Sequence, residues 1–362
     1  MKIVAYNRVA LRQLVESDFF AGLDKIPISR HRAESHIQNP YCSDDDVLLW
    51  AAYQEDALIG YVGALPDLIR LNNIENKIYW LSCFWVNETY RDKNIASSLF
   101  FPLVKLYRKQ LFISNFLFSL EKTYQSLGVF QATQNKPGCV FHRNLCLGEK
   151  LKARFSFFKY LLPVYRLVEK GFNLVLSVRR LFVASMDKED NIVESAVFDD
   201  EFRTFLTEFS SKHDDVIVRD AGHFEWIFTY PWILPGKPDE ESRRYYFSSK
   251  SDHFTYHSLK LYESQKMVGY ALAKIRDNHL VVSYLYAEDR DVEKFGKYIL
   301  ELARIKNLDT ITSCEPRLCG VLRKYKRHFI FVKNTRRPYI FSNTIQIAST
   351  VFQDGDGDSV FT

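Results

Sequence analysis

Long apolar runs are missing from this chain of 362 residues. No stretch reaches the ~18 consecutive apolar residues that a membrane-spanning helix needs, which argues against an integral membrane protein. The first twenty residues, MKIVAYNRVALRQLVESDFF, also lack the continuous apolar core of a secretory signal peptide. We therefore expect a cytoplasmic protein.

Closely paired cysteines are missing as well, because no two of the six stand in a C-x-x-C spacing. Several lie in apolar runs, where cysteine behaves as a small hydrophobe. We expect reduced and mostly buried thiols, which are typical of a reducing compartment. A zinc site built on Cys139, His142 and Cys146 would lack a fourth ligand, so we expect no metal. The cysteines are Cys42, Cys83, Cys139, Cys146, Cys314 and Cys319.

A strong charge of either sign is absent, since the net charge is only +5. This value is too low for a protein that coats nucleic acid, and we expect no nucleic-acid partner. A mildly basic chain does suit anionic ligands such as phosphates. Apolar residues make up 47% and charged residues 26%, which is typical of globular proteins, and the length predicts two domains.

The first half alternates β-type and helical patterns. An apolar run as long as 78–86 is typical of a strand at the centre of a sheet. We predict, in order, strands at 47–53, 58–65 and 78–86, a helix from Lys93 that Pro102 kinks, a strand at 111–118, and a helix at 120–127 that Gly128 ends. This order predicts an α/β fold of the α+β type with a mixed sheet.

The second half repeats this order. We predict a helix at 199–211, strands at 254–262, 267–275 and 280–287, a helix at 292–305, a strand at 309–313, a helix at 316–325 and short closing strands at 329–332 and 339–341. The segment Leu58–Ala64 (LIGYVGA) also resembles Met267–Ala273 (MVGYALA). Together, the shared order and this local similarity suggest an internal duplication.

A basic segment separates the halves. Between 148 and 182, eight Lys or Arg and two Glu alternate with Phe, Leu and Tyr. Two interpretations are open: an amphipathic connector packed on both domains, or a helix that lies on a membrane surface. Pro163 and Gly171 predict that the segment is broken into pieces. We therefore divide the chain into domains at 1–147 and 183–362, joined by the connector 148–182.

The junction after the strand at 78–86 has the features of an anion site. The strand runs into a short loop with two cations, Arg91 and Lys93, and the loop opens a helix. Unpaired N–H groups and the helix dipole at such a start favour negative charge. The small residues Ala96 and Ser97 allow close approach to the backbone. An ordinary solvated turn is the alternative.

This junction resembles the acyl-CoA loop of the GCN5-related N-acetyltransferase (GNAT) superfamily, whose pattern is [Q/R]-x-x-G-x-[G/A]. Here Arg91–Ala96 reads RDKNIA, so Asn94 stands where the family prefers Gly. Asn tolerates the left-handed backbone better than most residues. The resemblance implies that the loop holds the pyrophosphate and that the strand end pairs with pantetheine as an added strand. The implied binding residues are Phe84, Trp85, Val86, Arg91, Asp92, Lys93, Asn94, Ile95, Ala96 and Ser97.

The resemblance also implies a catalytic acid. GNAT proteins often carry a Tyr followed by a Leu-Gly turn, and Tyr124–Gly128 reads YQSLG. Tyr124 would protonate the departing thiolate after a neutral amine attacks the thioester, while an N–H in 84–86 meets the charge on oxygen. The alternative is a Tyr packed between helix and sheet. The Asn that many members carry earlier is replaced by Leu117 and Leu120. We name no base and interpret Asp44–Asp46 as a solvated loop.

The second half lacks this loop, because Glu288, Asp289 and Asp291 stand at the matching helix start and would repel a diphosphate. It would shape the acceptor site instead. Candidate acceptor residues are Glu225, Trp226 and Trp232, with a plain aromatic core as the alternative. The acidic C-terminal segment 354–358 (DGDGD) is interpreted as a flexible tail.

Taken together, the resemblance implies two tandem GNAT-like domains, with acetyl-CoA or another acyl-CoA as cosubstrate in the first. The expected acceptor is a primary amine of a small molecule or an amino sugar. Two alternatives are open: a FemABX-like aminoacyltransferase that uses aminoacyl-tRNA, and a non-catalytic binding protein with a vestigial site. The residues do not indicate the oligomeric state.

Overall fold

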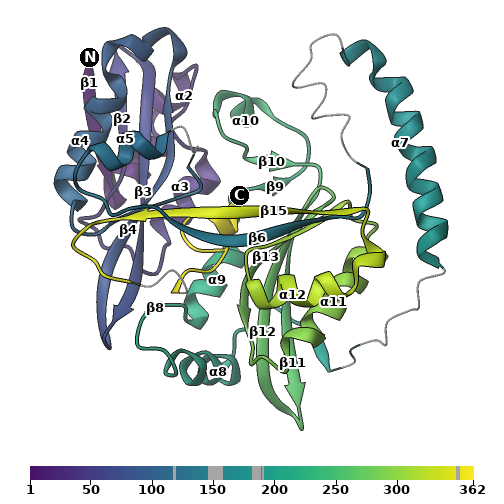
Figure 1. Ribbon diagram of the computed structural model, residues 1–362. Coiled ribbons are helices and arrows are strands. Elements are labelled where there is room, and N and C mark those ends of the chain that lie inside the picture. Colours follow the sequence, from purple (N-terminus) through teal and green to yellow (C-terminus); the bar gives the residue numbers. More distant parts are fainter. Residues whose placement is uncertain (117–119, 146–157, 182–188, 190, 348–350) are drawn as a thin grey trace. The chain divides into compact units, whose positions relative to one another are not determined.

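The computed structural model describes residues 1–116, 120–145, 158–181, 189, 191–347 and 351–362 (Figure 1). They form two compact units, each assembled from separate parts of the sequence. The first unit contains Met1–Lys136, Ala196–Tyr256 and Arg337–Thr362, and the second contains Pro137–Ser195 and His257–Arg336. Both units extend across the domain boundaries predicted at 147 and 183. The division into domains at these residues stays a prediction.

The sheet of the first unit begins with four antiparallel strands. They are β1 (Lys2–Asn7), β2 (Val47–Gln54), β3 (Ala57–Leu71) and β4 (Ile74–Val86). Next, β5 (Leu111–Ser114) pairs in parallel with β4. The predicted hairpin and central strand are confirmed, although β3 runs six residues past Leu65 and β1 was not predicted. The last three residues of β15 (Phe331–Phe341) pair with the other edge of β5.

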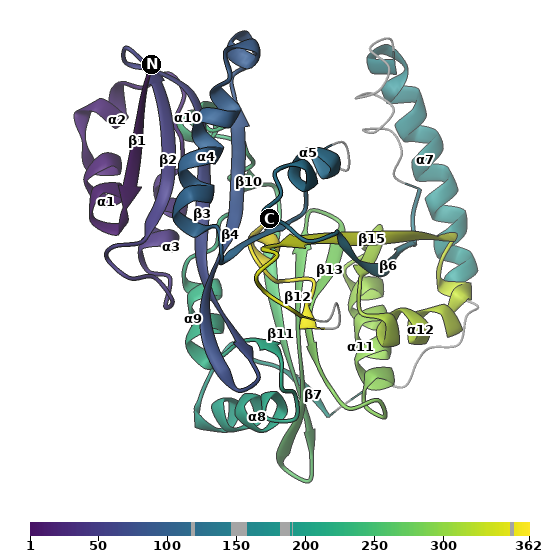
Figure 2. The same cartoon turned by 60° about the vertical axis from the view of Figure 1, so that its left-hand side comes forward.

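Helices cover both faces of these strands (Figure 2). One face packs on α4 (Ile95–Tyr107) and α5 (Glu121–Ser126). The other packs on α1 (Arg8–Glu16), α2 (Asp18–Gly22) and α3 (Arg30–Ile37). This arrangement explains the apolar character of the central strands, because side chains on both faces are buried. Gly128 has a φ of +67°, so its predicted role in ending α5 is confirmed.

The segment 196–256 adds further elements to the first unit. They are α8 (Asp200–Ser210), β8 (Val216–Ile217), α9 (Ala221–Thr229), β9 (Leu234–Pro235), α10 (Glu240–Arg244) and β10 (Lys250–Ser251). The short strand β8 pairs with the outer part of β3. The helix predicted at 199–211 is confirmed, and Glu225 and Trp226 lie on α9.

The second unit repeats the element order. Its elements are β6 (Gln134–His142, from Pro137 on), α7 (Phe158–Leu181), β7 (Ile192–Glu194), β11 (Phe254–Glu263, from His257 on), β12 (Lys266–Arg276), β13 (His279–Tyr286), α11 (Val292–Ile305), β14 (Thr310–Ser313) and α12 (Pro316–Lys324). The other strands and helices predicted for this half are confirmed, and α11 begins and ends where expected, but the two short closing strands predicted at 329–332 and 339–341 are one continuous strand, β15. The break predicted at Pro163 and Gly171 is wrong, because α7 continues through both. Pro163 removes only one hydrogen bond near the helix start, and a glycine costs about 1 kcal/mol.

The strands of the two units share one topology. In the first, β4 pairs antiparallel with β3 and parallel with β5, and α4 connects β4 to β5. In the second, β13 pairs antiparallel with β12 and parallel with β14, and α11 makes the connection. Each unit takes a strand from the other half of the sequence, since Tyr339–Phe341 pairs with β5 and Cys139–His142 pairs with β14. This exchange explains why the compact units are not contiguous in sequence.

Candidate functional site

The site is built around the end of β4, where the strand leaves its neighbours. The register with β3 shifts here, so that Cys83 and Phe84 together face only Val62. Cys83 has a φ of +48°, as expected for a strained bulge residue. On the other edge, β5 pairs with β4 only at Tyr79 and Trp80. Within the described chain, the backbone of 82–86 therefore has no strand partner on the β5 side.

The loop after β4 presents a helix start to solvent. A short 3₁₀ helix (Glu88–Lys93) ends at Asn94, whose φ of 58° and ψ of 21° confirm the predicted left-handed conformation. Helix α4 begins at the next residue with no capping side chain and no acidic residue in its first turn. Lys93, Ala96 and Ser97 are exposed. The first amides of α4 are therefore available to an anion.

Close packing holds this helix start in place. A Cβ on Gly60 of β3 would lie 3.0 Å from Leu99 and 3.1 Å from Ile95, both on α4. Only glycine allows the helix to come so near the strand at this point. The Lys93 ammonium lies 4.8 Å from the centre of the Tyr90 ring. The side chains of Arg91 and Asp92 lie outside the described structure, so their predicted contacts stay predictions.

Tyr124 lies in an aromatic cluster that links α5 to this site. Its ring centre is 5.9 Å from that of Phe100 on α4, which is in turn 6.1 Å from that of Phe84 on β4. The side chain is buried, and burial raises the pKa of its phenol to about 12. Tyr124 is therefore a protonated donor at neutral pH. The structure brings it into the same core as the end of β4 and the start of α4.

A buried polar cluster behind the bulge was missed by the sequence analysis. Arg32 of α3 donates hydrogen bonds to Ser82 Oγ (2.7 Å), Tyr245 Oη (2.9 Å) and Cys83 Sγ. Its guanidinium carbon lies 3.7 Å from the centre of the Trp232 ring. Only 3% of Arg32 is exposed. The cluster thus places a buried positive charge against the bulge of β4.

Charges within this cluster compensate one another. Ser82 Oγ donates to Asp358 Oδ2 at 2.8 Å, so Ser82 bridges Arg32 and an acid of the C-terminal segment. Burial raises the pKa of the Cys83 thiol, although Arg32 opposes the shift, and Cys83 remains a neutral thiol. Burial would lower the pKa of Arg32, but its hydrogen bond to Cys83 and the negative charge of Asp358 outweigh burial and raise the pKa. Arg32 therefore stays charged.

The candidate acceptor residues occupy different environments. Trp226 and Trp232 are buried, and their ring N–H groups donate to Ser35 O (2.7 Å) and Ser35 Oγ (2.8 Å). Both rings pack on Phe361, with ring centres 4.7 and 4.5 Å away. Glu225 is exposed and lies 3.9 Å from Arg203. The two tryptophans thus form a wall of the core, and Trp232 supports Arg32, whereas Glu225 is not part of this group.

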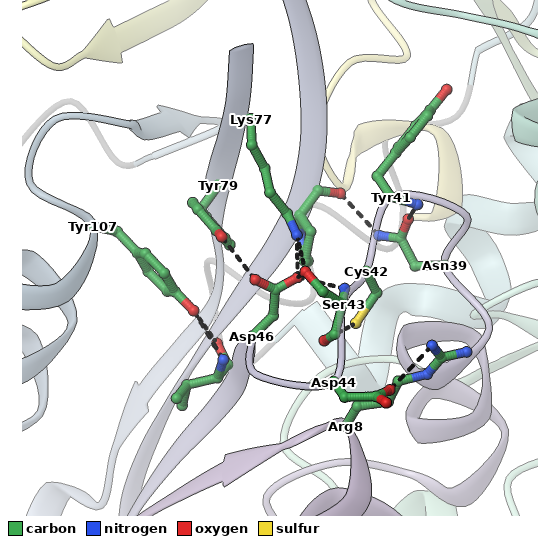
Figure 3. A network of polar contacts seen from close by, with 12 residues as sticks. Arg8, Asn39, Tyr41, Cys42, Ser43, Asp44, Asp46, Lys77, Tyr79 and Tyr107 are labelled. Carbon is green, nitrogen blue, oxygen red and sulfur yellow. Dashed lines mark hydrogen bonds and ion pairs between the residues drawn. The ribbon is translucent and has the colours of Figure 1, made fainter.

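Asp46, the last of the three consecutive acids Asp44–Asp46, accepts hydrogen bonds from four donors (Figure 3). Its carboxylate accepts from Lys77 Nζ (2.5 Å), Tyr79 Oη (2.7 Å) and both the amide and hydroxyl of Ser43. Burial alone would raise its pKa, but these donors hold the pKa below its ordinary value. Since both oxygens are occupied, Asp46 is a structural anchor. The solvated-loop interpretation is therefore wrong for Asp46, which is 6% exposed.

Two of the three C-terminal acids, Asp354 and Asp356, are buried, so the flexible-tail interpretation is wrong. Asp356 Oδ1 lies 2.9 Å from Arg219, which also makes two contacts of 2.7 and 2.9 Å with Asp67. Asp354 lies 2.9 Å from Arg337. Burial raises the pKa of Asp356 to about 6, against the influence of Arg219. Arginines distant in sequence compensate these acids, and local composition could not show that.

The described part of the chain contains free thiols but no candidate metal cluster. No group of three or more His, Cys, Asp or Glu side chains there could hold a metal ion. Cys139, Cys314 and Cys319 are buried free thiols, as predicted, while Cys42 and Cys83 are only half-buried. Cys146 lies outside the described residues. At the matching helix start of the second unit, the fully buried Asp291 pairs with Lys294 at 2.8 Å, and it stands at the position that Asn94 takes in the first unit.

Comparison with known proteins agrees with this geometry. Residues 9–131 match the model of the acetyltransferase (GNAT) family. A comparison with curated proteins finds no match. The match runs from α1 to just past α5, and so includes the bulge, the helix start and Tyr124.

Solved structures resemble nearly the whole chain in fold. A protein from Enterococcus faecalis V583, described as a probable N-acyltransferase, is 9% identical, with a TM-score of 0.53 over 95% of this chain and 73% of that chain. N-myristoyltransferase of Saccharomyces cerevisiae with bound myristoyl-CoA is 12% identical, with a TM-score of 0.50 over 94% of this chain and 82% of that chain. At these identities the likeness shows the fold alone.

Proposed function

We propose that the protein is an acyl-CoA-dependent N-acyltransferase whose first unit binds the cosubstrate, a proposal supported by the match of residues 9–131 to the model of the acetyltransferase (GNAT) family. The observation that carries the proposal is the uncapped start of α4, placed by left-handed Asn94 directly after a strand with an open edge. A diphosphate fits the first feature and an extended pantetheine arm fits the second. The residues present therefore fit coenzyme A.

The binding roles follow from this geometry. Amides from Lys93 to Ser97 hold the pyrophosphate, and Lys93 adds positive charge. The backbone of Phe84, Trp85 and Val86 pairs with pantetheine along the edge that β5 leaves open. A bound acyl-CoA supplies the activated thioester. The bulge at Cys83 then turns a nearby amide of 84–86 toward the thioester oxygen, where negative charge develops.

Acceptor chemistry is proposed on the same basis. A neutral primary amine, of a small molecule or an amino sugar, attacks the carbonyl carbon, and proximity in the site supplies much of the rate. As the C–S bond breaks, Tyr124 gives its proton to the departing thiolate; the amine nitrogen releases one proton to solvent, and solvent reprotonates Tyr124. Acetyl is the proposed acyl group. A related fold binds myristoyl-CoA, so longer acyl chains belong in the same assay.

Ligand binding tests the proposal directly. Acetyl-CoA is expected to raise the melting temperature, because a ligand at one hundred times its dissociation constant stabilises the folded state by about 2.7 kcal/mol. Thermal-shift measurements with acetyl-CoA, myristoyl-CoA and free adenosine diphosphate would separate recognition of the acyl arm from recognition of the diphosphate. If no acyl-CoA shifts the melting temperature, the aminoacyl-tRNA and vestigial-site alternatives are favoured.

The acid role is tested by Tyr124→Phe. We expect kcat to fall about tenfold with little change in the KM for acetyl-CoA. This loss in kcat is smaller than is usual when a general acid is removed, because a thiol of pKa ~8.5 leaves readily without help. Since the pKa of Tyr124 is about 12, kcat should show no alkaline loss from this residue below that pH. Tyr230→Phe, at the end of α9, is the control, and an unchanged kcat in Tyr124→Phe would remove the assignment.

A further inference from the structure

The second unit carries a helix with an exposed apolar face. In α7 (Phe158–Leu181), Leu161, Val164, Val168, Phe172 and Val175 recur at spacings of three and four residues and so lie on one side. Tyr160, Leu167 and Leu174, seven residues apart, widen the same side. These eight side chains, here called the apolar stripe, are between 45% and 75% exposed. A single exposed apolar residue is ordinary, but a continuous stripe of this size marks an interaction surface.

The helix is fixed to its unit through a different side. Asn173 accepts a hydrogen bond from the Leu145 amide (2.8 Å) and donates to the Leu145 carbonyl (3.0 Å). The partly buried residues Tyr165, Glu169 and Leu176 lie on the same side as Asn173. The apolar stripe therefore faces away from the side that holds the helix.

Positive charge accompanies the stripe. Helix α7 contains Lys159, Arg166, Lys170, Arg179 and Arg180 but only one acid, Glu169. Arg166 and Lys170 are exposed and lie one turn apart on the polar side. No helix among the described residues is long and apolar enough to cross a membrane. Broad apolar and basic sides on one helix are the features of a segment that lies in the plane of a membrane surface.

We propose that α7 binds the surface of an anionic lipid bilayer, with the apolar stripe inserted among the lipids and Arg166 and Lys170 against the headgroups. The width of the stripe favours a bilayer over a partner helix. A coiled-coil seam uses two residues in seven, whereas the stripe has eight exposed apolar side chains between 160 and 175. Negative lipid is required because each basic residue near such a surface adds to the attraction.

Vesicle flotation tests the proposal with the full chain. We expect binding to vesicles of phosphatidylcholine mixed with phosphatidylglycerol to be at least about tenfold stronger than to phosphatidylcholine alone, and to weaken as salt rises. Leu167→Glu combined with Val175→Glu should abolish it, because both substitutions place charge in the stripe. Arg166→Gln combined with Lys170→Gln should retain residual binding but lose most of the preference for phosphatidylglycerol.

The control is Ile305→Glu, which places the same charge on an equally exposed apolar residue (68%) of the same unit. It should bind vesicles as the unchanged protein does. Circular dichroism would show that all variants fold. Equal binding to both kinds of vesicle, or no binding, would overturn the proposal. So would light scattering that shows self-association in the unchanged protein and its loss in the stripe variant, since the stripe would then be a protein interface.

Discussion

Replacing Ala96 with aspartate is expected to remove acyl-CoA binding while the fold stays intact. Ala96 is the second residue of α4, exposed at the helix start that we assign to the pyrophosphate. A carboxylate there would compete with the diphosphate for the same amides. Two unit charges ~4 Å apart near a protein surface repel by about 4 kcal/mol. We expect the affinity for acetyl-CoA to fall at least about a hundredfold, or ~2.7 kcal/mol.

The same substitution should leave the stability of the free protein unchanged or slightly higher. A negative charge in the first turn of a helix is stabilising by roughly 0.3–1 kcal/mol. This variant should therefore lose acetyl-CoA binding without losing stability. A misfolded variant would lose both. Calorimetric titration with acetyl-CoA gives the first quantity, and melting of the free protein gives the second.

Val9→Asp is the matched control. Val9 is 53% exposed and is also the second residue of its helix, α1, which has no acid in its first turn. This variant adds the same charge to an equivalent position of the same unit and should bind acetyl-CoA normally. If Ala96→Asp binds as well as the control, the diphosphate does not lie at α4 and the proposed function loses its main support.

Local signals explain which parts of this site could be predicted. Asn94 could be placed in a left-handed conformation because that preference belongs to the residue itself, and Gly128 could be placed at the end of α5 for a similar reason. Helix α11 was predicted to the residue, since Phe295, Ile299 and Leu302 repeat at helical spacing and are all buried. Such features depend on neighbours in sequence.

Features that depend on distant partners could not be predicted. Arg32 lies in a polar run of α3, and only the fold brings it to Ser82 and Tyr245. The exchange of closing strands between the two units depends on pairing between residues about two hundred positions apart. The C-terminal acids were misread for the same reason, because their Asp-Gly composition is typical of a mobile segment.

The second large effect is a loss of stability that we expect from Arg219→Met, because Arg219 pairs with one of those acids, Asp356. Arg219 is the cation between Asp67 and Asp356, and the three side chains are at most 5% exposed. Removing it leaves two buried carboxylates without their partner, which typically costs about 3–5 kcal/mol. Urea unfolding should show a loss of this size. Arg203→Met, which breaks only the exposed 3.9 Å pair with Glu225, should change stability by less than about 0.5 kcal/mol.

The pH dependence of this loss identifies its cause. Asp356 already has a pKa raised to about 6 by burial, with Arg219 opposing the shift. A raised pKa means that the folded state binds the proton more tightly than the unfolded state, so stability is lost as pH rises through about 6. Without Arg219 the pKa rises further, and the penalty at pH 7 grows. The difference in unfolding free energy between Arg219→Met and the unchanged protein should therefore shrink as the pH is lowered from 7 toward 5. A difference that does not vary with pH would mean that the loss comes from packing rather than from unpaired charge.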